Sequence, residues 1–449
     1  MLDLKVINGT LVIPGTGAVK AGVGIKDGKI VQIARESELP EAGKTVDAAG
    51  KYVLPGLVDP HVHLGIFSDF AGECVTETQA ALAGGVTTIG VFMGGGDSYL
   101  GQLDGMLETA GSRISTDMFL HLSIFTPQQM EEIPQYIEKY GITSFKFYMC
   151  GVKGVFPGVS DGFFLEGLRT IAKLGDGFTA CVHCEDQSIV DMAFEKVAQE
   201  RPNGTLADWA DAGPSEAEAE AVLRACYLAA KSGARVYIVH MSSEEGVNIA
   251  AKHRPPNLFV ETTSAYLSVS KNAEVGLLAK MLPPLKGEND IEALWEAVKN
   301  DTIDTFGTDN VSMNKAVKGA ENGMLGAMPG YPIVQTHLPV LLHEGYHKRG
   351  VSLEKIVEKA SRNPAEIFGL YPQKGTIAVG SDADLVVVDL NKEVKVDPAQ
   401  LHSFGDFSLY QGKTLKGWPV VTIKGGVVAV EDNNILVEPG RGRYLRRQG

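Results

Sequence analysis

Hydrophobic and polar positions follow one pattern near both ends of the chain and another in its middle. Near the ends, short apolar stretches alternate with turn residues; these stretches are residues 4–7, 10–13, 23–26, 30–34, 383–389, 420–424 and 427–430. The dipeptides Asn8-Gly9, Asp27-Gly28 and Gly425-Gly426 separate neighbouring stretches, and such dipeptides favour tight β-hairpin turns. We therefore predict one small β domain assembled from both ends of the chain.

The middle of the chain alternates apolar runs with amphipathic segments of helical period. The strand candidates are eight in number, at residues 52–58, 86–92, 118–125, 143–147, 178–182, 236–239, 258–260 and 303–306. Strands that alternate with helices indicate βαβ units and a parallel sheet, and eight such units are typical of a (β/α)8 barrel. The alternative is an open doubly wound sheet, but Asp59-Pro60-His61 follows the first strand where that fold carries a Gly-rich phosphate loop.

These patterns predict an α/β protein in two parts. We expect a TIM-like (β/α)8 barrel over residues 53–372, and a small β-sandwich domain formed by residues 1–52 and 373–449. A chain of 449 residues is long enough for one large barrel and a smaller domain. The active site of such a barrel lies at the C-terminal ends of its strands.

Composition and charge exclude several classes of protein. The net charge is −14, from 41 basic and 55 acidic side chains, which argues against a nucleic-acid partner. No apolar run reaches the ~18 residues needed to span a bilayer, and the N-terminus has no signal-peptide pattern. The five cysteines are irregularly spaced, so a disulfide framework is not expected. We therefore expect a cytoplasmic protein without a membrane partner.

Candidate chemistry gathers where the predicted barrel strands end. The residues at these ends are four imidazoles, one amine and one carboxylate: His61, His63, Lys146, His183, His240 and Asp309. A single histidine at a strand end is usually a hydrogen-bonded core residue. Here, however, five of the eight predicted strands end in a residue suited to a metal. Because all strand ends of a barrel face one mouth, we predict that these side chains converge on a metal site.

The residue types fit two divalent metal ions, which we expect to be Zn²⁺. Neutral imidazole and carboxylate are typical zinc ligands, and two neighbouring cations need an anionic bridge. A lysine with a lowered pKa reacts with CO₂ to form a carbamate, so Lys146 is the candidate for that bridge. The metals would convert a shared water to hydroxide at neutral pH. Asp309 would then act as general base and carry the proton to the leaving nitrogen.

Longer motifs give this chain a family resemblance. The segments VLPGLVDPHVHLG (53–65), ETTSAYL (261–267), MLPPLK (281–286) and NPAEIFGLYPQKGTIAVGSDADLVVVD (363–389), with the strand-end residues, resemble the amidohydrolase superfamily. Its cyclic amidohydrolase branch contains hydantoinases, dihydropyrimidinases, allantoinases and dihydroorotases. The resemblance implies a homo-oligomer, a tetramer or dimer. It also implies how the ligands divide: His61, His63 and Asp309 at the more buried metal, His183 and His240 at the other, and carboxylated Lys146 between them.

Some positions depart from that branch. Dihydroorotases carry a substrate-binding arginine two residues after the HxH motif, where this chain has Gly65. Dihydropyrimidinases and D-hydantoinases carry a tyrosine for the oxyanion five residues after the bridging lysine, where this chain has Gly151. Tyr148 shares a strand face with Lys146 and is the candidate replacement. Thr263 and Asn322 are further candidates for substrate binding.

Taken together, the sequence predicts a binuclear metal-dependent hydrolase. It would open a C–N bond in a small cyclic amide or imide that resembles a hydantoin or a dihydropyrimidine. An allantoinase, a dihydroorotase-like enzyme or another amide hydrolase of the superfamily is the alternative. A non-catalytic scaffold related to dihydropyrimidinases is a further alternative, but the complete ligand set favours an enzyme.

Overall fold

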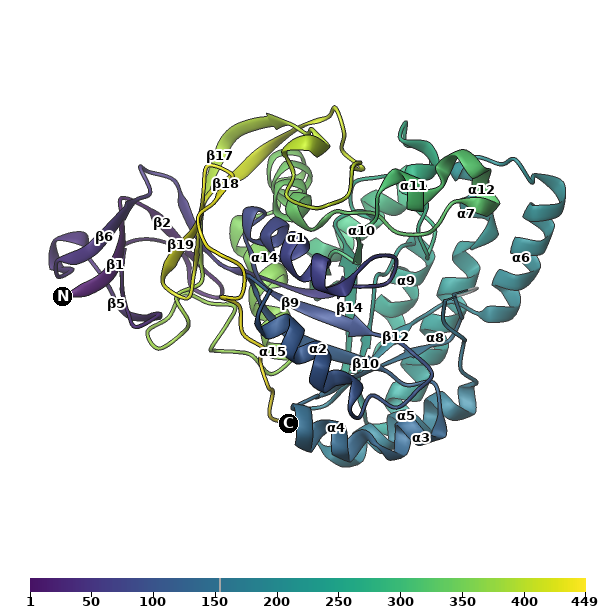
Figure 1. The fold of residues 1–449 in the computed structure, drawn as a ribbon. Helices are drawn as coiled ribbons and strands as arrows, with labels where there is room; N and C mark the ends of the chain where they lie inside the picture. The colour runs from purple at the N-terminus through teal and green to yellow at the C-terminus, as the bar shows by residue number, and fades with distance from the viewer. Residues whose placement is uncertain (153–154) are drawn as a thin grey trace.

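A computed structural model describes residues 1–152 and 155–449 of the chain. Figure 1 shows a barrel surrounded by helices, with β-sheets packed against one side of it. The N-terminus lies at the far edge of these sheets, whereas the C-terminus returns to the barrel (Figure 1). The predicted α/β barrel with a β-rich domain built from both chain ends is therefore confirmed. Over the described residues, none of the helices is long and apolar enough to cross a membrane.

One sheet of nine parallel strands forms the barrel, in the order β15-β14-β13-β12-β11-β10-β9-β8-β16. Its strands are β8 (Leu57–His63), β9 (Val86–Met93), β10 (Asp117–Ser123), β11 (Ser144–Tyr148), β12 (Thr179–His183), β13 (Arg235–Ile238), β14 (Leu258–Thr263), β15 (Thr305–Gly307) and β16 (Asn310–Val311). Almost every residue of these strands is buried, because helices cover the outside and side chains fill the inside.

The eighth strand of the barrel is split in two. Its first half, β15, pairs with β14, and its second half, β16, pairs with β8. Between the halves, the N–H of Asp309 donates to the carbonyl of His61 at 2.8 Å. The break at residues 308–309 thus closes the sheet and turns Asp309 toward the mouth of the barrel.

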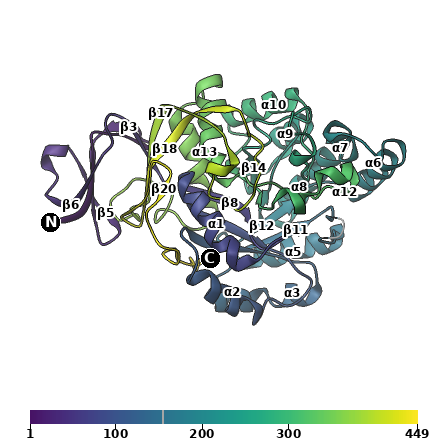
Figure 2. The same ribbon diagram turned by 45° about the horizontal axis from the view of Figure 1, so that its top comes forward.

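Helices and short helical turns connect the strands and surround the sheet (Figure 2). Several begin with a side chain that accepts a hydrogen bond from the first turn, as Asp69 does for α1 and Ser160 for α5. The helices are α1 (Phe70–Ala83), α2 (Gln102–Gly111), α3 (Pro127–Glu131), α4 (Ile133–Tyr140), α5 (Asp161–Leu174), α6 (Gln187–Glu200), α7 (Leu206–Ala212), α8 (Ser215–Ser232), α9 (Glu244–His253), α10 (Glu288–Lys299), α11 (Lys315–Lys318), α12 (Gly323–Gly326), α13 (His337–Val340), α14 (Leu353–Val357) and α15 (Asn363–Ile367).

Two further sheets form the β-rich part. The four-stranded sheet contains β5 (Lys29–Ala34), β4 (Gly22–Lys26), β1 (Leu2–Ile7) and β6 (Ala42–Asp47). The seven-stranded sheet contains β20 (Asn434–Ile435), β19 (Val427–Glu431), β18 (Thr414–Lys424), β17 (Leu385–Lys395), β7 (Tyr52–Pro55), β2 (Thr10–Ile13) and β3 (Gly17–Lys20). Apolar side chains from both sheets share one core, which includes Val6, Ile25, Val53 and Val387.

Two local expectations differ from the structure. The predicted strand 52–58 is two strands, because β7 pairs with β2 and β17 while β8 opens the barrel sheet. The Asn8-Gly9 dipeptide does not form a hairpin, since β1 and β2 belong to different sheets. By contrast, Asp27-Gly28 and Gly425-Gly426 do join paired antiparallel strands. A turn signal fixes the local backbone, but the partner of a strand is chosen by the packing of the whole sheet.

Candidate metal centre

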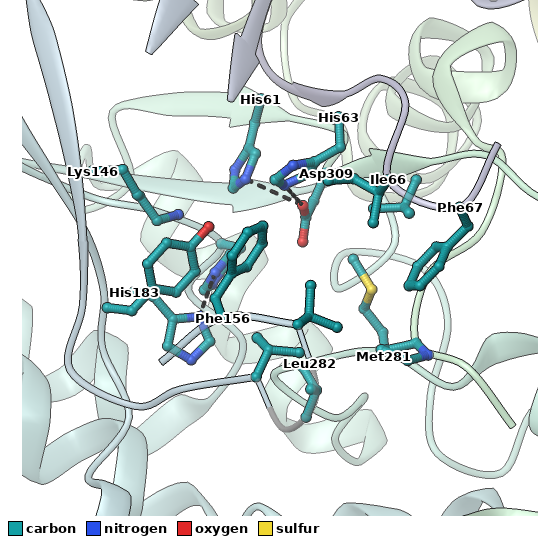
Figure 3. Close-up of a pocket in the computed structure, with 16 residues that line it drawn as sticks. His61, His63, Ile66, Phe67, Lys146, Phe156, His183, Met281, Leu282 and Asp309 are labelled. Atoms are coloured by element: carbon teal, nitrogen blue, oxygen red, sulfur yellow. Dashed lines mark hydrogen bonds and ion pairs between the residues drawn. The ribbon is translucent and has the colours of Figure 1, made fainter. Parts of the chain in front are cut away.

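The strand-end residues predicted from the sequence line one cavity at the mouth of the barrel. All six are buried or nearly so, and they come from β8, β11, β12, the end of β13 and the break in the eighth strand. Figure 3 shows Lys146 and His183 on one side of this cavity and His61, His63 and Asp309 on the other. The predicted convergence of His61, His63, Lys146, His183, His240 and Asp309 is therefore present in the fold.

One half of the cluster is built around Asp309. Its Oδ1 lies 3.2 Å from Nε2 of His61 and 3.1 Å from Nε2 of His63 (Figure 3). Burial alone would raise the pKa of Asp309, but His61 and His63 outweigh it and the pKa falls well below its usual value. Burial lowers the pKa of His63. This half therefore offers an ionised carboxylate and a neutral imidazole to a cation.

The other half contains the two histidines that follow β12 and β13. Nδ1 of His183 lies 2.9 Å from Nε2 of His240, and the rings meet edge to face. Burial, together with the nearby His183, lowers the pKa of His240 well below the usual value. Both imidazoles thus direct a nitrogen toward one point, as ligands of a shared cation do.

Lys146 stands between the two halves without an acidic partner among the described residues. Its side chain is 1% exposed, and Nζ lies 4.6 Å from the centre of the Phe92 ring. Burial lowers the pKa of Lys146 to about 8. About a tenth of this amine is therefore uncharged at pH 7, and the uncharged form is the one that reacts with CO₂.

Backbone geometry at two of these residues is unusual. His240 has φ 43° and Asp309 has φ 53°, values that non-glycine residues adopt rarely. Their neighbours hold them there: the N–H of His240 donates to Glu261 at 2.9 Å, and that of Asp309 donates to the carbonyl of His61. Strained conformations of this kind gather at functional sites, where the surrounding structure maintains them.

Three buried acids that the sequence analysis did not single out orient this cluster. Oε1 of Glu261 lies 2.7 Å from Nδ1 of His61, and Oε2 of Glu185 lies 2.9 Å from Nε2 of His183. Asp59 accepts hydrogen bonds from the backbone of His61 and from Thr308. Carboxylates that bind the far nitrogen of a histidine are typical of metal sites. Asp59 and Glu185 each lie two residues from the histidine that they contact, so this short spacing is a signal for them in the sequence. Glu261 is 200 residues from His61, and only the closed barrel brings it near.

The residues fit metal ions by a second criterion. Nε2 of His61 is buried and makes no hydrogen bond among the described residues, although Oδ1 of Asp309 lies 3.2 Å away. A buried imidazole nitrogen without a partner is costly unless a ligand satisfies it. Asp117, Asp382 and Asp384 form another group with suitable spacing, but Lys374 already lies among these carboxylates. The strand-end cluster is therefore the better candidate for a metal centre.

The remaining predicted residues occupy different places. Tyr148 is 5% exposed and lines the cavity. Thr263 is buried at the end of β14, and Asn322 is exposed near α12; neither is among the described residues that line the cavity. A role for Thr263 and Asn322 in substrate binding stays a prediction.

The two glycines that depart from the expected family pattern are required by their surroundings. A Cβ at Gly151 would lie 2.5 Å from N of Gly158 and 2.8 Å from O of Phe156. Both are backbone atoms, so a larger residue at 151 would force the loop to move. Gly65 has φ +76°, and a Cβ there would lie 2.9 Å from Cβ of Phe70. A tyrosine at 151 or an arginine at 65 does not fit this backbone.

Comparison with known proteins gives full-length matches. A sequence model of the amidohydrolase family matches residues 52–429. The L-hydantoinase of Paenarthrobacter aurescens is 34% identical, over 100% of this chain and 99% of that protein. The D-hydantoinase of Ralstonia pickettii is also 34% identical, with the same coverage. The solved structure of a D-hydantoinase (dihydropyrimidinase) from Thermus sp. has a TM-score of 0.90 and 30% identity, over 99% of each chain.

Proposed function

The chain belongs to the amidohydrolase family, as its motifs predict, and on that premise we propose that it hydrolyses a C–N bond in a cyclic amide or imide. The ring would resemble a hydantoin or a dihydropyrimidine, which agrees with the names of the relatives. The observation that carries the proposal is the convergence of four imidazoles, one amine and one carboxylate on a single cavity. A scaffold protein without chemistry would have no need of this complete set.

The proposed centre binds two divalent cations, for which Zn²⁺ is our choice. Bound cations of this kind polarise a carbonyl group and lower the pKa of water. His61, His63 and Asp309 would hold one cation, His183 and His240 the other, and Lys146, as a carbamate, would hold both. The orienting bonds from Glu261 to His61 and from Glu185 to His183 support this division.

Asp309 is proposed as the group that moves the proton. Its carboxylate is ionised at neutral pH, because His61 and His63 keep its pKa low despite burial. It would accept a proton from the attacking water and deliver it to the leaving nitrogen of the ring. The hydrogen bond from its N–H to the carbonyl of His61 keeps its side chain in place during that transfer.

Tyr148 is proposed as the donor to the developing oxyanion. It lies two residues after Lys146 on β11 and lines the same cavity. The ring packs in one aromatic cluster with Phe125, at a centroid distance of 5.5 Å, and Phe156, at 5.4 Å. Because the backbone leaves no room for a tyrosine at position 151, Tyr148 is the phenol that the cavity offers.

The wall of the cavity indicates an uncharged substrate. Apart from the metal cluster and Tyr148, the described lining residues are apolar: Ile66, Phe67, Val152, Val155, Phe156, Met281, Leu282, Val311 and Pro329. None of the described lining residues carries a guanidinium group that would pair with a substrate carboxylate. This wall favours a cyclic amide with an apolar substituent over dihydroorotate, whose ring carries a carboxylate.

The wider setting is proposed as well. We propose a cytoplasmic homo-oligomer, a tetramer or dimer; the five cysteines are free and buried, which supports a reducing compartment. We also propose that the barrel and the β-sandwich domain meet at residues 52/53 and 372/373.

The function is tested by a ring-opening assay on protein loaded with metal. The panel contains hydantoin, 5-substituted hydantoins, dihydrouracil, allantoin and dihydroorotate, with Asp309→Asn as the control. We expect turnover of a hydantoin or dihydropyrimidine, and its loss in the variant even though most of the metal is retained. Turnover of dihydroorotate alone, or equal rates in the variant, would contradict the proposal.

A further inference from the structure

Two buried lysines that the proposed chemistry does not use lie near the metal cavity. Lys318 is fully buried, and Lys280 is 5% exposed. Among the described residues, both ammonium groups donate to backbone carbonyls, and neither has a carboxylate partner. An ammonium group loses its hydration on burial, so such a position is costly unless the protein supplies acceptors. The cost indicates that the two ammonium groups have a structural role, which is to hold the chain segments whose carbonyls they bind.

The acceptors belong to two chain segments, 280–282 and 323–330. Nζ of Lys280 donates to the carbonyl of Met324 at 2.7 Å and to that of Ala327 at 2.6 Å. Nζ of Lys318 donates to the carbonyl of Lys280 at 2.8 Å and to that of Gly330 at 2.7 Å. The N–H of Gly330 reaches the same Lys280 carbonyl at 3.0 Å. The two side chains thus fasten one segment to the other.

Both fastened segments supply walls of the metal cavity. Met281 and Leu282 follow Lys280 directly, and Pro329 is the last residue but one of the second segment; all three line the cavity (Figure 3 labels Met281 and Leu282). Trp209 of α7 supports the same wall, because its Nε1 donates to the carbonyl of Met281 at 2.8 Å. The Lys280 ammonium lies 4.1 Å from the centre of the Trp209 ring, within the range of a cation–π contact.

We infer that Lys280 and Lys318 are positioning residues that fix this wall and so limit which substituent fits beside the metal centre. The inference rests on the proposed function for the identity of the substrate, but not for the fastening itself. Removing the Lys318 ammonium takes one donor from each of two interior carbonyls, so the wall at Met281 and Pro329 loses part of its support. Neither lysine touches the reacting atoms, so the effect would fall on binding rather than on the chemical step.

The kinetic test compares Lys318→Met with Lys315→Met. Methionine keeps most of the side-chain length and removes the charge; Lys315 lies in the same helix, α11, but is exposed. We expect Lys318→Met to raise KM for a hydantoin with a bulky 5-substituent about tenfold, and to change kcat for unsubstituted hydantoin less than about twofold. The control should behave as wild type. Equal KM values in Lys318→Met and wild type would overturn the inference.

Hydrogen exchange tests the fastening without any substrate. The amides of Met328 and Gly330 donate to the carbonyls of Lys318 and Lys280. We expect both to exchange at least about tenfold faster in Lys318→Met than in wild type or Lys315→Met. Unchanged exchange would overturn the inference. If the wild-type protein opens no ring of the panel, the proposed function is refuted. The exchange measurement still tests whether Lys318 holds the two segments together, because it needs no substrate.

A second variant covers the case in which Lys318→Met fails to fold. Lys280→Met removes the bonds to Met324 and Ala327 and leaves the Lys318 bonds intact, and it is examined by the same exchange measurement. If neither variant folds, hydrogen exchange of the wild-type protein decides the question. Protection of the Gly330 amide as strong as that of the β14 amides supports the inference, and rapid exchange of the Gly330 amide overturns it.

Discussion

At the scale of single residues, the cavity combines side chains whose usual states are altered by burial. Lys146 has no direct ion-pair partner among the described residues, and burial lowers its pKa to about 8 although Asp309 partly opposes that effect. Asp309 shows the opposite effect, because its histidine neighbours keep it ionised. An amine that can become a carbamate and an ionised carboxylate face one cavity, an arrangement suited to holding two cations. Their separate chemistries can be tested one residue at a time.

Lys146→Ala should abolish ring opening, because the group that joins the two halves of the cluster is lost. Added short-chain carboxylates should restore part of the activity by occupying the vacated space. The measurement is the initial rate with and without acetate or propionate, and exposed Lys139→Ala serves as the matched control. Full activity of Lys146→Ala without an additive would refute the carbamate.

Tyr148→Phe should lower kcat about 10²–10³-fold, the usual effect of removing one oxyanion donor. The phenylalanine keeps the stacking against Phe125 and Phe156, so KM should change little. Steady-state kinetics on the best substrate of the panel decide the matter, with Tyr346→Phe as a control away from the cavity. An unchanged kcat would assign the oxyanion to other groups.

At the scale of elements, the site depends on how strand ends are joined across the barrel. Glu261 lies in the buried part of β14 and connects three neighbours: the ring of His61 on β8, the hydroxyl of Tyr237 on β13, and the N–H of His240. The split eighth strand completes the ring, because Asp59 of β8 accepts from Thr308 in the break. The carboxylate of Glu261 thus fixes His61 and His240, which belong to different halves of the proposed centre.

Glu261→Gln should weaken metal binding by about 10–100-fold, because His61 loses the acceptor that fixes its orientation. Competition with a chelator measures the metal affinity directly and does not depend on turnover. Glu296→Gln, on the exposed side of α10, provides the matched control. Equal affinity of Glu261→Gln and wild type would show that the histidine is oriented without the carboxylate.

At the scale of the whole molecule, a buried charge network joins the barrel to the β-sheets. Nζ of Lys374 lies within 2.8 Å of Asp117 at the start of β10 and of Asp382 and Asp384, just before β17. Lys424 of β18 and Arg443 near the C-terminus bind the same acids. Burial would raise the pKa values of Asp117 and Asp382, but these cations outweigh it and lower both.

The lowered pKa values predict how stability depends on pH. Unfolded aspartate has a pKa of about 3.9, so the contribution of Asp117 and Asp382 is complete above that value and is lost as the pH falls below it. The pKa of Lys374 is raised despite burial, so its contribution is complete at neutral pH and is lost only above about pH 10. Urea unfolding between pH 3 and 7 should show the acid limb of this dependence.

Lys374→Met should lower the free energy of unfolding by about 3–5 kcal/mol at pH 7, because three buried carboxylates lose their shared partner. Lys392→Met removes a surface pair with Asp432 and should change it by less than about 0.5 kcal/mol. The variant should also lose most of the acid dependence. Equal unfolding midpoints for Lys374→Met and wild type would refute a stabilising role for the network.

The sequence alone determined the class of fold and the residues of the candidate metal centre. Alternating apolar runs and helical segments predicted the barrel, and His61, His63, Lys146, His183, His240 and Asp309 stood out because each follows an apolar strand. Such patterns are local, so they can be recognised without knowing which strands pair with one another. The resemblance to the cyclic amidohydrolases followed from contiguous motifs for the same reason.

Only the tertiary structure decided which distant groups meet. Closure of the barrel brings Glu261 to His61, although 200 residues separate them, and no spacing along the chain reports that contact. Backbone crowding at Gly151 likewise depends on how Phe156 and Gly158 pack against it, and the place of Tyr148 in the cavity depends on the closed barrel. The same holds for the sheet to which β7 belongs and for the contacts of Lys280 and Lys318 with the cavity wall. Long-range packing determines these partners, and a local sequence pattern does not specify them.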